Sequence, residues 1–474
     1  MPEKAFLHPQ TQARRKGAGL TGDRMSGTSL ALTKWALALL PGLAVMAIPP
    51  GSACSGDMLL WGGLTLILIS VWGMQLLPDM VVGLAIPVCY IIAGLLPMNE
   101  AYAPWLGLAP WTTTGGIIIG IALQKTGLAR RIVLTLLARF SRSFFAMLFI
   151  LGLSGAVLPV IPMPARCVLF VSLGVTICEE LHFEKKSAAA TAVMLAAMFS
   201  AIGTGAMFLQ DGGVYIFTQL PDTPMTWTFF LFRSGIPAFV ILFASVGLAA
   251  FTVRDKWALP VRSMLREQHE KLPPMSAAEK KLLGVLLLML LAFLTINKAH
   301  SLNIAMILML AALTLFLPKM AVLSNDDLRA FNHSIVFMTC GAMSIGIAAS
   351  HVQATQLIKE ALIPLFDACG GGFPYLVSFL TGLAANFFLT PLAAISAFTL
   401  PLHELATELA LPAENLLIAF NLGLDQYLFP YEMTLIFFFT GTGYINLSSM
   451  TRLLGVRMAL STVLVLLIAV TFWS

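Results

Sequence analysis

Long apolar runs follow one another along almost the whole chain, and this pattern constrains the fold more than any other feature of the sequence. Thirteen runs can be bounded, from residues 31–48 at the start to 451–473 at the end, with short polar segments between most of them. A bilayer core is crossed by about 20 helical residues. Charged residues make up only 11% of the chain, whereas soluble domains contain about a quarter. The sequence therefore predicts an all-α polytopic membrane protein that contacts lipid and does not bind nucleic acid.

Two of the runs, 143–177 and 371–403, are too long for one crossing and too short for two. Each fits two short helical limbs that enter and leave on the same side of the membrane. The first run contains three prolines that end at Pro164, and the second contains Pro391. Proline interrupts a helix, and non-helical backbone is tolerated at this depth only inside protein or beside a cavity. We therefore expect two re-entrant hairpins and about eleven transmembrane helices.

The distribution of Lys and Arg predicts the orientation. With this topology, 24 of the 28 basic residues fall on one side, including Arg452 and Arg457 near the start of the last run. Basic residues are enriched in cytoplasmic loops. We therefore expect a cytoplasmic N-terminus, an external C-terminus and insertion in a bacterial cytoplasmic (inner) membrane.

The two halves of the chain carry the same plan. Gly115 in TTGGIIIGIALQKTG aligns with Gly341 in TCGAMSIGIAASHVQ at an offset of 226, and Pro164 aligns with Pro391 at an offset of 227. An amphipathic stretch and then a hairpin follow each glycine motif. The predicted topology opens the two hairpins to opposite sides, so the repeats are inverted. Inverted repeats with interrupted helices near the membrane midplane are the architecture of secondary transporters.

At the level of motifs, the chain resembles the divalent-anion:sodium symporters, a family of dicarboxylate, citrate and sulfate carriers in the ion-transporter superfamily. The matching pieces are GIALQKTGLARR at 120–131, MSAAEKKLL at 275–283 and GTGYINLSSM at 441–450. The order of hairpin, broken helix, helix, basic linker and repeat also matches, from about residue 31 onward. The resemblance implies a homodimer in which a fixed scaffold supports a transport unit that moves like an elevator.

This resemblance divides the chain into six parts. They are a cytoplasmic tail (1–30), scaffold helices 1–4 with a first interfacial arm (31–142), the first hairpin with transport helices 5–6 (143–252), a cytoplasmic linker (253–280), scaffold helices 7–9 with a second arm (281–370), and the second hairpin with transport helices 10–11 (371–474).

Arg166 is the most informative single residue. The hairpin tips of the family usually read Ser-Asn-Thr, whereas the first tip here contains Pro164 and Arg166. A charged residue at mid-membrane depth costs at least about 2.5–3.5 kcal/mol, so it needs an anion, a cavity or a carboxylate partner. We expect Arg166 to grip a substrate carboxylate. The alternatives are a shallow position at the interface and a salt bridge with Asp211. The predicted substrate-binding residues are Arg166, Pro164, Asn386, Thr390 and Pro391.

Acidic residues inside apolar runs are candidates for coupling the substrate to an ion. A carboxylate at this depth pairs with a cation or takes up a proton. Asp211 and Glu432 occupy similar places in the two repeats, and Asp425 is a third candidate that could instead cap a helix start. Na⁺ could bind near Asn386 and Glu432, although no metal site is firm and no other cofactor is expected. The predicted coupling residues are Asp211, Glu432, Asp425, Thr204 and Asn421.

These features predict a secondary active transporter of small organic anions, di- or tricarboxylates, coupled to Na⁺ or H⁺ or run as an anion exchanger. The alternative within the superfamily is a cation/proton antiporter or an inorganic oxyanion permease. An intramembrane enzyme or sensor is disfavoured, because the sequence shows no constellation of catalytic residues.

Overall fold

Helices form every regular element that the structure describes. The computed structural model describes residues 24–51, 54–158, 161, 163–220, 225–296, 302–368, 373–433 and 435–473. Four helices in these ranges are long and apolar enough to cross a membrane, and seven shorter apolar helices accompany them. The chain is an all-α polytopic membrane protein, as the sequence predicts. Most of the predicted tail, residues 1–30, lies outside the described residues, and the first helix already begins at Arg24.

Among the described residues, the first half of the chain and the linker contain thirteen α-helices, and η3 is one of two π-helical turns there. They are α1 (Arg24–Met46), α2 (Gly56–Gly73), α3 (Asp79–Ile92), α4 (Met98–Ala101), α5 (Leu108–Thr126), α6 (Leu128–Phe140), α7 (Phe144–Leu153), α8 (Met163–Glu180), α9 (Ala188–Ala201), the π-helical turn η3 (Leu209–Gly213), α10 (Val214–Phe217), α11 (Trp227–Phe230), α12 (Ile236–Phe251) and α13 (Arg262–Glu270).

The second half repeats this order with nine described α-helices. They are α14 (Ala277–Thr295), α15 (Ile304–Thr314), α16 (His333–His351), α17 (Ala354–Ala368), α18 (Pro374–Phe388), α19 (Pro391–Glu408), α20 (Ala413–Leu424), the 3-10 turn η7 (Pro430–Glu432), α21 (Ile436–Thr440) and α22 (Leu447–Ile468).

Both predicted hairpins are interrupted helices. In the first, α7 has only 10 residues, which is about 15 Å of helix and half of a bilayer core. The chain continues as the 3-10 turn η2 (Ser154–Val157), and α8 begins at Met163. Pro159 and Pro162 lie outside the described residues. In the second, α18 ends at Phe388, and α19 restarts with Thr390 as its N-cap and Pro391 in its first turn. Proline suits that position because it lacks the N–H that would have no helical partner there.

One helix of each half packs against a helix of the other half, and the two contacts match. α3 packs along α16, and α15 packs along α5. A side chain at Gly341 of α16 would collide with the carbonyl oxygen of Gly83 in α3, and a Cβ at Gly115 of α5 would lie 2.9 Å from the carbonyl carbon of Leu308 in α15. Gly115 and Gly341 are the aligned glycines of the repeat, and each permits the same close backbone approach. The repeat therefore corresponds to two matching helix contacts.

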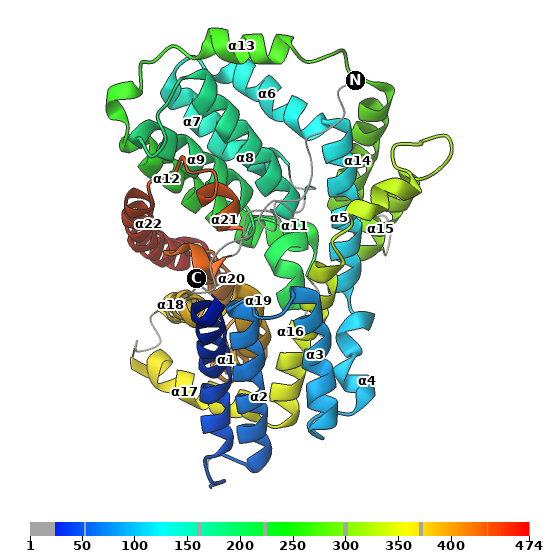
Figure 1. Cartoon of the computed structure of the whole chain (residues 1–474), viewed down its shortest axis with the longest axis vertical. Coiled ribbons are helices and arrows are strands. Elements are labelled where there is room, and N and C mark those ends of the chain that lie inside the picture. The colour runs from blue at the N-terminus through cyan, green and yellow to red at the C-terminus, as the bar shows by residue number, and fades with distance from the viewer. Residues whose placement is uncertain are drawn as a thin grey trace.

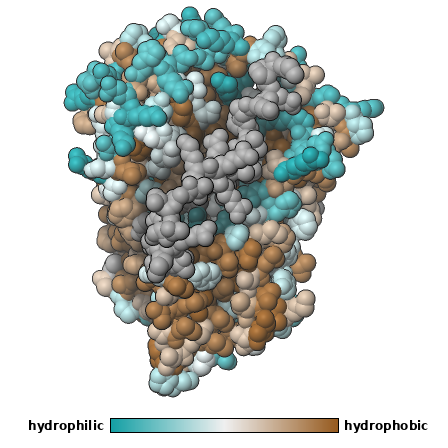
Figure 2. Space-filling model, in the orientation of Figure 1, coloured by the Kyte–Doolittle hydropathy of each residue, from teal (hydrophilic) through white to brown (hydrophobic). Residues whose placement is uncertain are grey.

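The two amphipathic arms lie at opposite ends of the molecule. In Figure 1, α6 lies at one end of the long axis beside the linker helix α13, and α17 lies at the other end. Figure 2 shows hydrophilic residues gathered over the end that carries α6 and α13, and a mainly hydrophobic surface over the lower part. This placement of equivalent arms at opposite ends is the arrangement that an inverted repeat requires.

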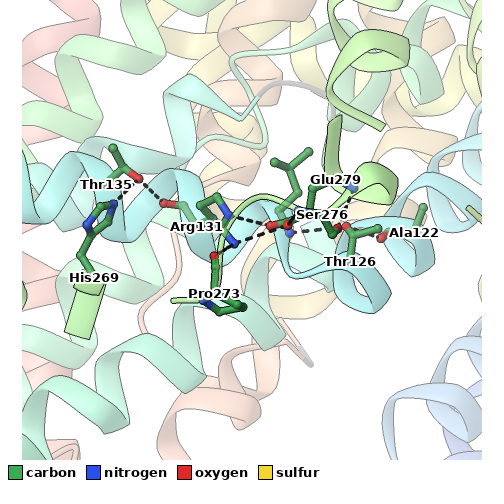
Figure 3. Close-up of polar contacts among 9 residues, drawn as sticks. Ala122, Thr126, Arg131, Thr135, His269, Pro273, Ser276 and Glu279 are labelled. Carbon is green, nitrogen blue, oxygen red and sulfur yellow. Dashed lines mark hydrogen bonds and ion pairs between the residues drawn. The ribbon is translucent and has the colours of Figure 1, made fainter. Parts of the chain in front are cut away.

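Polar contacts fasten the linker between the halves onto the first arm (Figure 3). Arg131 of α6 donates from Nε to Glu279 Oε1 at 2.6 Å and from Nη2 to the carbonyl of Pro273 at 2.7 Å. Glu279 also accepts from the backbone of Ser276 at 2.7 Å and so caps α14. His269 of α13 lies 3.2 Å from the hydroxyl of Thr135. The linker is thus a docked element rather than a free connection.

The glycine contact between α3 and α16 predicts that alanine destabilises the protein at Gly341 and not at a glycine outside the contact. Gly341→Ala should lower the free energy of unfolding by about 1–3 kcal/mol, because the added methyl overpacks a backbone contact. Gly284→Ala in α14 is the matched control, since a Cβ there meets no atom within 4 Å. It should be neutral or slightly stabilising. Thermal unfolding of the purified protein in detergent measures both, and equal melting temperatures for the two variants would contradict the predicted packing.

The linker contact predicts a measurable coupling between Arg131 and Glu279. Arg131→Gln should destabilise the protein by about 1–3 kcal/mol, because it leaves the buried Glu279 carboxylate without its cation. A double-mutant cycle with Glu279→Gln should give a coupling energy above about 0.5 kcal/mol. Lys271→Gln removes an exposed pair with Glu267 on the same linker, and its effect should stay within about 0.5 kcal/mol. Additive effects of the Arg131 and Glu279 substitutions would show that the pair does not hold the linker.

Candidate functional site

A cavity of about 340 Å³ lies where the two hairpins, the two interrupted helices and the helices α5 and α16 meet. The first hairpin contributes Met163 to its wall, and the second contributes Thr390 and Pro391. Thr113 of α5 and Thr339 of α16 face it from the aligned glycine motifs of the repeat. The volume is in the range of small-molecule sites, which lie between about 300 and 1,000 Å³.

Two interrupted helices form the polar part of the wall. α9 ends at Ala201, and the chain passes through turns and η3 before α10 begins. α20 ends at Leu424, and the chain passes through Asp425 and η7 before α21 begins. α9 and α20 are buried along nearly their whole lengths. The interruptions of these two buried helices therefore lie beside the cavity, where their free backbone groups can bind a ligand.

Arg166 forms a buried ion pair with Asp211. Its Nη2 lies 2.8 Å from Asp211 Oδ2, its Nη1 donates to the carbonyl of Ile161 at 2.9 Å, and its Nε donates to the carbonyl of Ala201 at 3.1 Å. The side chain of Arg166 is 0% exposed, so a shallow interfacial position does not describe it. Asp211 lines the cavity and Arg166 stands behind it. Of the alternatives for Arg166, the structure contains the salt bridge with Asp211. Direct contact between Arg166 and a substrate stays a prediction, because Arg166 does not line the cavity in this conformation.

A second buried ion pair joins Arg457 of α22 to Asp425. Nη2 of Arg457 lies 2.9 Å from Asp425 Oδ2, and Nη1 donates to the Asp425 carbonyl at 2.9 Å. Arg457 is therefore a buried residue and not an exposed loop cation, because this side chain is only 4% exposed and is paired inside the protein. Asp425 follows the C-terminus of α20 and caps no helix start. The signal for Arg457 was present in the sequence, since it lies within the apolar segment LLGVRMAL.

Glu432 differs from the two aspartates because no Lys or Arg of the described chain pairs with it. Its carboxylate accepts from the backbone N–H groups of Leu428 and Phe429, each at 3.0 Å, and from Asn386 Nδ2 at 3.4 Å. The residue is 3% exposed and lines the cavity. Asn386 comes from the first limb of the second hairpin, so it joins that hairpin to Glu432. The structure thus brings together the two residues between which Na⁺ was predicted.

Several buried amide groups near the cavity have no hydrogen-bond partner within the described residues. They are Asn386 Oδ1, Gln426 Oε1 and Asn421 Nδ2, and the Thr112 hydroxyl shares this property. Buried polar groups are nearly always paired, and exceptions point to a water, an ion or a ligand. Asn421 and Thr112 line the cavity.

Two other predicted residues have a less direct relation to the cavity. Thr204 donates to the Ser200 carbonyl at 3.2 Å. Pro164 lies in the first turn of α8, and its side chain is not among those that the structure describes.

The sequence did not single out some of the polar cavity residues. Asp79, at the start of α3, accepts from the indole N–H of Trp72 at 3.2 Å, and Tyr215 and Tyr427 also line the wall. Tyr215 is 3.2 Å from the hydroxyl of Thr113. Around the described wall there are four carboxylates, those of Asp79, Asp211, Asp425 and Glu432, and no Lys, Arg or His.

The buried pair in the first half predicts a strong effect on stability. Arg166→Gln should destabilise the protein by about 3–5 kcal/mol, because it leaves Asp211 buried without its cation. Arg130→Gln on the exposed face of α6 removes the same charge where no contact depends on it, and should change stability by less than about 0.5 kcal/mol. Thermal unfolding in detergent checks both variants. A small effect of Arg166→Gln would mean that Arg166 is free to turn toward a ligand.

Comparison with known proteins supports the transporter architecture. No curated protein matches the chain. A comparison with protein families matches residues 64–423 to CitMHS, the citrate transporter family, in agreement with the predicted resemblance to the anion carriers of the ion-transporter superfamily. This is a family of transporters and not of enzymes. On this match, which covers most of the chain, the protein belongs to the citrate transporter family.

Proposed function

We propose that this protein carries di- or tricarboxylates such as citrate by cation-coupled alternating access. Membership of the citrate transporter family makes the chain a secondary anion transporter in general. The finer proposal depends on one observation: the described wall of an anion transporter's cavity carries acidic side chains and no basic side chain.

Charge balance supports coupling to cations. Arg166 and Arg457 neutralise Asp211 and Asp425, whereas Glu432 and Asp79 have no basic partner in the described residues. Two like charges 4 Å apart repel by about 4 kcal/mol at the effective dielectric constant near a protein surface. A substrate with two or three negative charges therefore needs cations beside it in this cavity. Na⁺ or H⁺ at Glu432, with the free amide oxygen of Asn386 nearby, would supply that compensation.

Helix ends supply the groups that would bind the anion. α8 begins at Met163 and α19 at Pro391, and both residues lie at the cavity. The N-terminus of a helix carries a partial positive charge and free N–H groups, which favour carboxylates. The predicted residues Pro164, Thr390 and Pro391 would thus act through the backbone of the helix starts. Asn421 Nδ2 would add a side-chain donor.

An elevator movement is the mechanism that suits this arrangement. The arms α6 and α17 lie at opposite ends (Figure 1) and flank the helices that form the hairpins. Lys359 of α17 is 2.5 Å from Glu408 at the end of α19, so the second arm holds the second hairpin directly. We extend the proposal to a homodimer in a bacterial inner membrane with a cytoplasmic N-terminus. The scaffold would comprise α1 to α5 with α14 to α16.

Transport by purified protein in liposomes tests this function. Labelled citrate should accumulate when an inward Na⁺ or H⁺ gradient is imposed, and succinate and sulfate define the selectivity. Glu432→Gln should lower gradient-driven accumulation by at least about tenfold, because among the described residues it is the one cavity carboxylate of the interrupted helices that lacks an arginine. Glu270→Gln, an exposed glutamate of the linker helix, is the matched control and should transport like the wild type.

Two outcomes would overturn the proposal. If no anion moves but the ion gradient collapses in a way that depends on Glu432, the protein is a cation/proton antiporter. If citrate accumulates equally in the Glu432→Gln variant, coupling does not pass through this residue.

A further inference from the structure

The two buried ion pairs share one geometry. In each pair the aspartate lines the cavity, and the arginine stands behind it without reaching the wall. Each aspartate uses Oδ2 for its arginine, and its Oδ1 has no hydrogen-bond partner among the described residues. Each pair therefore uses one carboxylate oxygen of a cavity-lining aspartate for the arginine, and the other oxygen has no partner in the described part of the chain.

The repeat alignment does not explain this shared geometry. The offset that places Pro164 on Pro391 places Arg166 on Ala393, so the second hairpin has no equivalent arginine. The arginine of the second pair comes instead from α22, the last helix. The two pairs are thus built from positions that the repeat does not relate. An arrangement assembled twice from different elements around one cavity is more readily explained by its use there than by inherited packing.

Contacts with three residues hold the Arg457 guanidinium in a single orientation. Besides its two bonds to Asp425, it donates from Nε to Ser245 Oγ of α12 at 3.0 Å, and its Cζ lies 5.6 Å from the ring centre of Phe199 in α9. The planar fork of arginine makes such an arrangement rigid. Because Nη1 also binds the Asp425 carbonyl, Arg457 fixes both the backbone and the side chain of Asp425. This fixes the direction in which the free oxygen of Asp425 points.

We propose that Arg457 is a positioning residue for transport, which holds Asp425 so that its free Oδ1 binds the cation that accompanies the anion. This inference rests on the proposed function and adds a residue to it. A carboxylate oxygen is a hard ligand that suits Na⁺ and other hard cations. Arg457 neutralises the buried carboxylate of Asp425 while the cavity is empty. When the cavity fills, the carboxylate of Asp425 binds the cation. Arg166 stands in the same relation to Asp211.

A neutral replacement of the pair separates this role from a structural one. The double variant Arg457→Gln/Asp425→Asn keeps two hydrogen-bonding groups of similar size and removes both charges. It should fold, because no unpaired charge is left buried. Citrate uptake driven by a Na⁺ or H⁺ gradient should nevertheless fall by at least about tenfold, since a charged hydrogen-bond acceptor is lost from the site. Wild-type uptake by the folded double variant would overturn the proposal.

A milder variant keeps the test informative if the double variant does not fold. Ser245→Ala removes one support of Arg457 and keeps both charges. It should raise the KM for the driving cation, measured with Na⁺ and with H⁺, by about two- to tenfold with little change in kcat. Ser461→Ala, at a buried serine of the helix that carries Arg457, is the matched control and should leave the KM unchanged. Equal KM values for the two serine variants would contradict the positioning role.

The controls also separate this proposal from the function on which it rests. If the wild type accumulates no anion under any gradient, the proposed function fails. If the wild type accumulates citrate and the double variant matches it, only the role of Arg457 fails.

Discussion

Desolvation of charge is the constraint around which the centre of this protein is arranged. Arg166 and Arg457 lie at membrane depth and are 0% and 4% exposed, where an unpaired charge would cost several kcal/mol. Each is paired with one aspartate and also binds at least one carbonyl oxygen left free at a helix interruption, those of Ala201 and Asp425. The broken helices and the buried arginines therefore depend on each other, because the breaks leave carbonyls that need donors and the arginines need acceptors.

Close glycine contacts provide the rigid frame on which this polar centre lies. The N–H of Gly155, at the end of the first hairpin limb, donates to Ser200 Oγ of α9, with the nitrogen 2.7 Å from the oxygen. Gly382 in the second hairpin lies close to the backbone of α20, where a side chain would collide with the Phe420 carbonyl. Each hairpin is thus packed directly against the interrupted helix of its own half. The cavity between the hairpin tips follows from these two contacts and from the exchange of α3 and α15 between the halves.

The architecture could be predicted from the sequence because the features that define it are local. The lengths of the apolar runs, Pro391 and the aligned glycines define the hairpins and the repeat without any long-range contact. The site was reached only in part, because its geometry depends on distant partners: Arg457 meets Ser245 across 212 positions. A count of positive charges could not distinguish Arg457 from a cytoplasmic residue near the same helix end. Asp79 was missed because it reads as an ordinary acidic residue in the first turn of a helix.

The repeat is broken in one place that bears on movement. The second limbs of the hairpins end at Glu180 and Glu408, which align at an offset of 228. Glu408 is held directly by Lys359 of its arm, whereas Glu180 is held by Gln268 of the linker helix, at 2.5 Å in both cases. The linker helix in turn packs on the first arm. The polar tie from arm to hairpin is therefore direct in the second half, whereas in the first half the linker helix makes the polar tie and α6 packs directly on α7. Displacement of the first hairpin relative to α6 must alter the contacts of the linker helix. The connection between the repeats is consequently a packed part of the fold and not only a covalent link.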